Sequence, residues 1–204
     1  MVRKILIYCF LMVSSIGLFA QVKDWKLERN EAGIAVYSKP STSRGIKELK
    51  IITTIQCDIR KLVNILDDLA NAKRYMDSYK VSKTLVQETK NSRWDYVEVT
   101  MPWPLSNRDI VVNHSHTFDT VTQTYTSRLK SNPTYIAAKN GIVRLKNMQG
   151  GWIIKSTGER SVSTEYYILL DPGENIPAWI INLFVVDVPF ETISKLRALA
   201  EKEA

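Results

Sequence analysis

From residue 79 to residue 170 the sequence consists of strand-like segments separated only by short turns. The turns contain residues that favour tight loops, as in TKNS, PLSN, KNG and QGG. Because no helical pattern separates these strands, neighbouring strands must pair antiparallel. The pattern therefore predicts an antiparallel meander. The expected strands span residues 79–88, 93–101, 108–118, 122–130, 141–147, 152–158 and 162–170.

Two further strands and one helix are expected before this meander. GIAVYSKP (33–40) and IKELKIITTI (46–55) have the composition of strands joined by a turn. After them, apolar residues recur every three or four positions, which is typical of an amphipathic helix. Asp58 precedes this pattern and can cap the free N–H groups of the first helical turn. The residues that form the apolar stripe are Ile59, Leu62, Val63, Leu66 and Leu69.

The C-terminal segment, IPAWIINLFVVDVPFETISKLRALAEKE, again has a helical pattern. Pro177 suits the first turn of a helix, whereas Pro189 should kink the helix or divide it. The first half of the segment is apolar on nearly every side, so it must be buried on more than one side. A long helix held by a strongly curved antiparallel sheet satisfies this requirement, and the expected fold class is therefore α+β.

The first twenty residues have the pattern of a secretory signal peptide. Arg3 and Lys4 form a basic start, an apolar run follows, and Ala20 is a suitable cleavage position. The alternative is a retained membrane anchor. We expect a signal peptide at 1–20, one domain at 21–204, and export to the periplasm or the outside of the cell. Cleavage would leave Cys57 as the sole cysteine, so no disulfide within the chain is expected.

The charge of the chain does not favour a nucleic-acid partner. The whole sequence carries a formal charge of +7, which falls to +5 when Arg3 and Lys4 are removed with the signal peptide. The basic residues are scattered and form no Lys/Arg runs of the kind found in nucleic-acid-binding arms. We therefore expect no nucleic-acid partner. We also expect a monomer.

The two histidines of the chain are expected to face the interior of the sheet. Side chains alternate along a strand, so Ile110, Val112, His114, His116 and Phe118 share one face. The residues between them are mostly polar and belong to the wetter face. The strand at 162–170 has a similar inner face, formed by Val162, Thr164, Tyr166, Ile168 and Leu170.

Three interpretations of His114 and His116 remain open from sequence alone. A zinc site needs a third protein ligand, and the sequence offers no other histidine, so we expect no tightly held metal. The histidines can instead be hydrogen-bonded core residues, or polar groups that line an apolar cavity. No nucleophile elbow, P-loop or dinucleotide-binding glycine pattern is present, so neither catalytic residues nor a cofactor are expected.

Three stretches together resemble the START (steroidogenic-acute-regulatory-related lipid-transfer) domain family: MPWPLSNRDIV, STEYYILLDPGENIPAWIINLF and VPFETISKLR. The resemblance covers roughly residues 23–204. It implies a helix-grip fold, in which a curved sheet wraps around a long C-terminal helix and a tunnel between them holds one lipid or sterol. Some members carry a basic residue in the cavity near the position of His114.

The resemblance and the strand faces together give a set of candidate site residues. The expected gate loop at the cavity mouth contains Trp103, Leu105 and Arg108, although Trp103 can alternatively plug the end of the core. Charged residues at the start of a strand, such as Arg108 and Asp109, more often fix a turn than contact a ligand. The residues expected to line the cavity are Val112, His114, His116, Tyr96, Tyr166, Ile168, Trp179 and Phe184.

The expected function is the binding and transfer of a lipid or other hydrophobic small molecule. The cavity should lie between the inner faces of strands 93–101, 108–118 and 162–170 and a helix over 177–188. The partners would be a lipid or sterol-like molecule and, transiently, a membrane. Two alternatives remain open, because fold alone does not determine function: a helix-grip enzyme of cyclase or hydrolase type, and an interaction module with a collapsed cavity.

Overall fold

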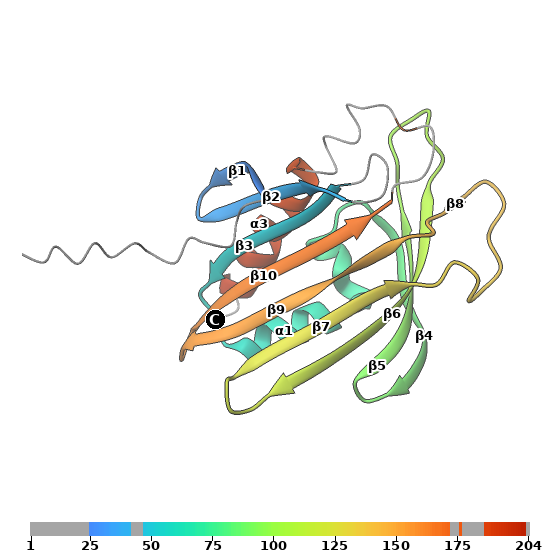
Figure 1. Cartoon of the computed structure of the whole chain (residues 1–204). Helices are drawn as coiled ribbons and strands as arrows, with labels where there is room; N and C mark the ends of the chain where they lie inside the picture. The colour runs from blue at the N-terminus through green and yellow to red at the C-terminus, as the bar shows by residue number, and fades with distance from the viewer. Residues whose placement is uncertain (1–24, 42–46, 172–175, 177–185, 203–204) are drawn as a thin grey trace, which may run out of the picture.

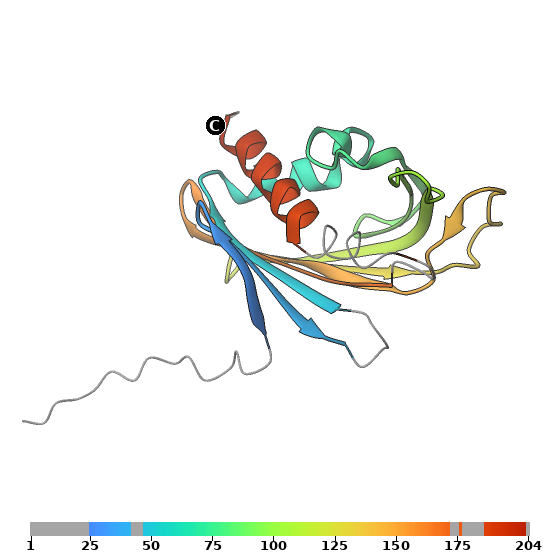
Figure 2. The same ribbon diagram turned by 90° about the horizontal axis from the view of Figure 1, so that it is seen from above.

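In the computed structural model the described residues, 25–41, 47–171, 176 and 186–202, form one strongly curved sheet with helices on its concave face (Figures 1 and 2). The strand order is β1-β2-β3-β10-β9-β7-β6-β5-β4, and every pair along it is antiparallel. Short β8 pairs with β6 in parallel. The strands are β1 Lys26–Glu31, β2 Ile34–Pro40, β3 Lys47–Ile55, β4 Tyr79–Thr89, β5 Ser92–Val99, β6 Arg108–Asp119, β7 Thr124–Ser131, β8 Val143–Arg144, β9 Met148–Gly158 and β10 Ser161–Leu170.

The helices of the described residues lie on the concave side, here called the inner face: α1 (Ile59–Asp67), η1 (Leu69–Arg74) and α3 (Val188–Lys202) (Figure 2). The predicted helix that starts at residue 59 is confirmed. Asp58 caps it, because its Oδ1 accepts hydrogen bonds from the backbone N–H groups of Arg60 (2.7 Å) and Lys61 (3.4 Å). Pro189 is the second residue of α3. The expected helical residues 177–185 lie outside the described residues.

The meander is confirmed, with two differences from the predicted strands. β1 was not predicted, because KLERNE is mostly charged; the strand forms at an edge of the sheet, where such residues remain in water. Ala32 and Gly33 make its tight turn to β2 with positive φ angles of 48° and 75°. The strand expected at 141–147 is reduced to β8, because most of residues 132–147 form a loop instead.

The main hydrophobic core lies between the helices and one half of the sheet. Ile193 and Leu196 of α3 and Leu62 of α1 are almost completely buried against Ile51 and Ile55 of β3. This packing explains the three- and four-residue spacing of apolar residues in both helices. A second, smaller cluster lies on the inner face of the other half of the sheet, formed by Val97, Ile110, Val112 and Leu145.

Loop 132–147 is attached to the opposite, outer face of β5 and β6, although its Leu145 belongs to the inner cluster. Tyr135 of this loop stacks on Trp94, with ring centroids 4.1 Å apart. Arg144 forms a two-pronged ion pair with Asp109, at 2.7 Å and 3.0 Å, and also donates to backbone carbonyls of the loop. Asp109 is fully buried. Its role in the SNRD motif is therefore structural, as predicted for a charged residue at the start of this strand.

Candidate functional site: an apolar inner wall with a polar pocket at one end

Apolar side chains of β5, β6, β7, β9 and β10 form an apolar wall on the inner face of the sheet. Val97 of β5 lies directly opposite Ile110 of β6, and Val112 follows on the same face. In this cluster the partly buried apolar side chains outnumber the buried ones, whereas in the main core the buried ones predominate. This balance distinguishes the wall from the core at the other half of the sheet. These partly buried residues are Leu69, Tyr79, Val99, Leu129, Met148 and Leu170.

Of the predicted cavity residues, Val112, Tyr166 and Ile168 are on this inner side. Tyr166 is half-buried and stacks on Trp152 with ring centroids 4.5 Å apart. Ile168 follows two positions later on the same face, and it is also half-buried. Thr164, the polar residue expected in this row, donates its hydroxyl hydrogen to the Thr53 carbonyl at 3.1 Å. It is therefore a satisfied core residue.

Tyr96 lies on the outer face, contrary to the prediction that it lines the cavity. It pairs with Val111, whereas its neighbour Val97 pairs with Ile110 on the inner face. Loop 132–147 covers it, and the Lys139 ammonium lies 4.3 Å from its ring centroid. The error has a physical cause. Charged and aromatic residues alternate from Arg93 to Tyr96, and Arg93 and Asp95 occupy the inner face, where they neutralise each other.

Two other predicted cavity residues, Trp179 and Phe184, lie outside the described residues. Nothing in the structure tests their assignment.

The predicted gate loop, MPWPLSN at residues 101–107, lies between β5 and β6. Trp103 projects from it with 91% of its surface exposed, between Pro102 and a cis peptide bond to Pro104. The alternative that Trp103 plugs the core is therefore wrong. Leu105 is half-buried. Asn107 fixes the base of the loop, because its side chain accepts from the Met101 N–H (3.2 Å) and donates to Glu98 (3.3 Å).

Arg108 lies at the junction of this loop and the apolar wall. It pairs with Val99, so its side chain starts from the inner face of β6. The residue is 5% exposed, and its guanidinium NH1 donates to the Ser106 carbonyl. Its Nε has no hydrogen-bond partner among the described residues. Burial lowers the pKa of Arg108, so the charged form carries a desolvation cost here.

A charged cluster interrupts the apolar wall on β5, and sequence reasoning missed it. Arg93 Nε lies 2.8 Å from Asp95 Oδ2, and both side chains are largely buried. Arg93 also reaches Asp67, the last residue of α1, where NH1 lies 3.3 Å from Oδ1. The alternation of β5 could have placed Arg93 and Asp95 on one face. Asp67 could not have been found, because only the packing of α1 on the sheet brings it there.

His114 is the direct cross-strand neighbour of Arg93 and shares its environment. Its Nε2 lies 3.5 Å from the buried Tyr125 hydroxyl, and its Nδ1 lies 4.0 Å from Asp67 Oδ1. Burial, together with the nearby Arg93 charge, lowers the pKa of His114 to about 4. His114 is therefore neutral at pH 7. The adjacent His116 is half-buried, with its ring 5.4 Å from that of Tyr125.

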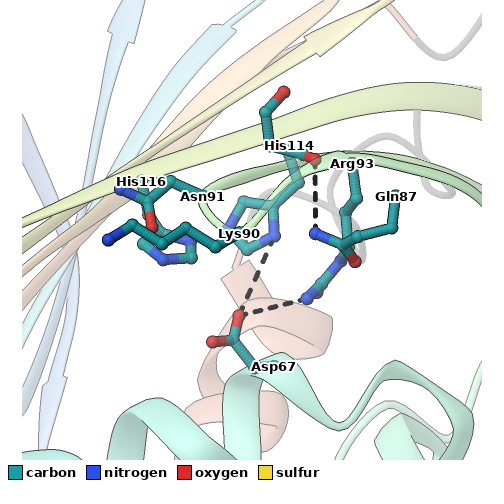
Figure 3. Close-up of a pocket in the computed structure, with 8 residues that line it drawn as sticks. Asp67, Gln87, Lys90, Asn91, Arg93, His114 and His116 are labelled. Carbon is teal, nitrogen blue, oxygen red and sulfur yellow. Dashed lines mark hydrogen bonds and ion pairs between the residues drawn. The ribbon is translucent and has the colours of Figure 1, made fainter.

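These groups surround a polar pocket of about 240 Å³ (Figure 3). The turn between β4 and β5 forms one side of the pocket, β6 forms another, and the end of α1 closes it. The gate loop joins the other ends of β5 and β6, so the pocket and the gate loop lie at opposite ends of these strands. The lining residues are Asp67, Gln87, Lys90, Asn91, Ser92, Arg93, His114 and His116.

A curved antiparallel sheet with a partly open apolar inner wall, a C-terminal helix and an exposed aromatic loop defines a helix-grip protein. The START domain sequence profile matches residues 18–203, and the chain belongs to this family. The match covers nearly the whole chain, so the sequence-based recognition is confirmed, as is the helix-grip fold.

Individual relatives agree with the assignment. An uncharacterised protein of Pseudomonas aeruginosa is 33% identical over 183 residues, which is 90% of each chain. The human phosphatidylcholine transfer protein is 28% identical over 164 residues, covering 78% of this chain and 75% of the relative. The crystal structure of a STAR-related lipid transfer protein from Xanthomonas axonopodis superimposes with a TM-score of 0.78 at 26% identity. It covers 87% of this chain and 98% of the other.

Proposed function

We propose that the protein binds one lipid molecule against the inner face of the sheet and transfers it between membranes. The observation that carries this proposal is the apolar wall around Val97 and Ile110, whose surrounding side chains are only partly buried. An apolar surface of this kind is stabilised by contact with an apolar ligand, at about 25 cal/mol per Å² removed from water. The transfer proteins among the relatives support the same function.

The lipid would find few polar partners on this wall, and they are concentrated on β5 and β6. The family resemblance implies a basic residue near position 114, where this chain has a neutral histidine. Arg93, directly opposite on β5, supplies a positive charge at the same level of the sheet. It is already paired with Asp95, so it suits a polar or zwitterionic group better than a bare anion. Arg108 offers a second guanidinium beside the gate loop.

The gate loop is proposed to be the point of transient membrane contact. Trp103 exposes a large aromatic ring, and tryptophan favours the boundary between water and lipid. No helix in the described part of the chain is both long enough and apolar enough to span a bilayer. We further propose that the protein acts as an exported monomer, without catalytic turnover and without a nucleic-acid partner. The basic start and apolar run of residues 1–20 support export, and the scattered basic charge argues against a nucleic-acid partner. The transfer proteins among the relatives support binding without turnover.

The test is lipid extraction from vesicles by a variant whose wall is blocked. Leu129 is half-buried on the inner face of β7, so Leu129→Trp should fill the space next to the wall and abolish extraction. Lys130→Trp places the same side chain at the next, exposed position and should leave extraction unchanged. Thermal unfolding of both variants verifies that they fold. Equal extraction by wild type and Leu129→Trp would refute the proposed site.

A further inference from the structure

We infer that Asp67, His114 and His116 form a weak, exchangeable site for a divalent transition-metal ion. The sequence argued against a metal because the two histidines had no third ligand. The packing of α1 on the sheet supplies one, since Asp67 ends α1 directly in front of the two imidazoles (Figure 3). The inference goes beyond the proposed function, and its test needs no lipid, because zinc binding is measured at the polar pocket alone.

The three ligand atoms are close enough to converge on one ion. One nitrogen from each histidine and one oxygen of Asp67 all lie within 4.8 Å of one another. Ligand atoms around a tetrahedral zinc ion lie about 3.4 Å apart, given zinc–nitrogen distances of about 2.0–2.1 Å. The imidazole centroids are 5.8 Å apart, compatible with the spacing of about 5–6 Å that two rings on one ion require. Small side-chain rotations therefore complete the site.

His114 is oriented for this role by Tyr125. Its Nε2 lies 3.5 Å from the tyrosine hydroxyl, deep in the core, so Nδ1 is the nitrogen that faces Asp67 and the pocket. Metal-binding histidines generally use the second ring nitrogen in such a hydrogen bond, which fixes the ring and its tautomer.

Arg93 limits the affinity of the site without preventing binding. Its NH1 forms an ion pair with Asp67 Oδ1 at 3.3 Å, while its Nε forms one with Asp95. Among these described groups two carboxylates face one guanidinium, so the cluster carries a net negative charge that a cation can neutralise. Lys90, the other lysine or arginine of the pocket lining, is exposed to water, so its charge is screened. These charges predict micromolar binding that a chelator reverses.

The ligand set also selects the metal. Two imidazoles and one carboxylate suit zinc, copper or nickel, whereas magnesium and calcium require mostly oxygen ligands. The pocket of about 240 Å³ leaves room for water at the remaining coordination positions. Because the ligands come from α1 and β6, a bound ion would link that helix to the sheet.

The experiment is calorimetric titration of the metal-free protein with zinc chloride. We expect one micromolar site, no binding of magnesium, and at least tenfold weaker zinc binding in both His116→Ala and Asp67→Asn. Cys57→Ser is the matched control, because Cys57 lies in the core, away from the three ligands. The Cys57→Ser variant should therefore bind zinc as tightly as the wild type does. Zinc at one hundred times its Kd should raise the Tm of the wild type by about 5–10 °C.

A spectroscopic measurement on the unaltered protein keeps the inference testable if a variant fails to fold. The cobalt-substituted protein should show d–d absorption bands of nitrogen and oxygen ligation, without a thiolate charge-transfer band. No saturable zinc binding by the wild type would overturn the inference. Binding that survives both ligand substitutions, or a thiolate band, would also overturn it, because the ion would then be held elsewhere.

Discussion

Replacing Arg144 by leucine should strongly destabilise the protein, because it leaves a buried carboxylate without its partner. Asp109 is 0% exposed, and Arg144 contacts both of its oxygens, at 2.7 Å and 3.0 Å. Removing one member of a buried ion pair costs about 3–5 kcal/mol. The same guanidinium donates to the carbonyls of Pro133 and Ile136 at 2.9 Å and 3.0 Å, so loop 132–147 loses its attachment as well.

Urea denaturation at pH 7, followed by circular dichroism, measures this cost. The expected loss of 3–5 kcal/mol corresponds to a decrease in Tm of about 6–20 °C for a chain of this size. Arg160→Leu is the control, because Arg160 is exposed in the turn between β9 and β10 and its replacement should change stability by less than about 0.5 kcal/mol. The double variant Asp109→Leu/Arg144→Leu should be more stable than Arg144→Leu alone. A loss below about 1 kcal/mol in the single variant would show that the pair does not hold the loop.

Three further predictions concern pH, the buried histidine and the gate loop. Glu28→Gln should cost about 1–2 kcal/mol of stability at pH 7. Hydrogen bonding to Lys26, as the largest cause, lowers the pKa of Glu28 from 4.5 to about 2. The stabilisation by the Glu28 carboxylate is therefore complete above pH 4.5 and is lost as the pH falls towards 2. Urea unfolding between pH 7 and pH 2.5 should show the two proteins converging, and a constant difference would contradict this cause. His114→Leu should cost about 1 kcal/mol, because the buried Tyr125 hydroxyl loses its hydrogen bond to the imidazole. Parallel thermal-unfolding and lipid-extraction assays show whether the substitution also changes lipid selection, and unchanged selection would remove His114 from the lipid site. Trp103→Ala should leave stability unchanged and weaken co-sedimentation with vesicles, whereas equal sedimentation would exclude the gate loop as the membrane contact.

The elements of this fold were predictable where one local pattern dominates. Alternation located the long strands and placed His114 on the inner face, and three- and four-residue spacing after Asp58 located α1. Loop 132–147 was not predictable in the same way. Its apolar and β-branched residues favour a strand at 141–147, but Arg144 uses its side chain to bind loop carbonyls and Asp109. A tertiary interaction thus overrides the local preference.

The candidate site shows a similar division between local and tertiary information. The inner-face positions of β6 and β10 followed from alternation, whereas Tyr96 was placed on the wrong face of β5. Tyr96 is buried, as its hydrophobicity favours, but loop 132–147 buries it on the outer face. Arg93 and Asp95 therefore occupy the inner face, where they neutralise each other. Asp67 carries no local signal at all, because it becomes part of the polar pocket only when α1 packs on the sheet.

The most direct test of lipid binding is the identification of lipids that remain bound through purification. Organic extraction of the purified protein, followed by quantitative mass spectrometry, should recover one lipid class in an amount approaching one molecule per protein. Leu129→Trp should carry little or none, because its added ring occupies the space beside the wall. Absence of lipid from the wild type, combined with failure to take up lipid from vesicles, would contradict the account and favour an interaction module with a collapsed cavity.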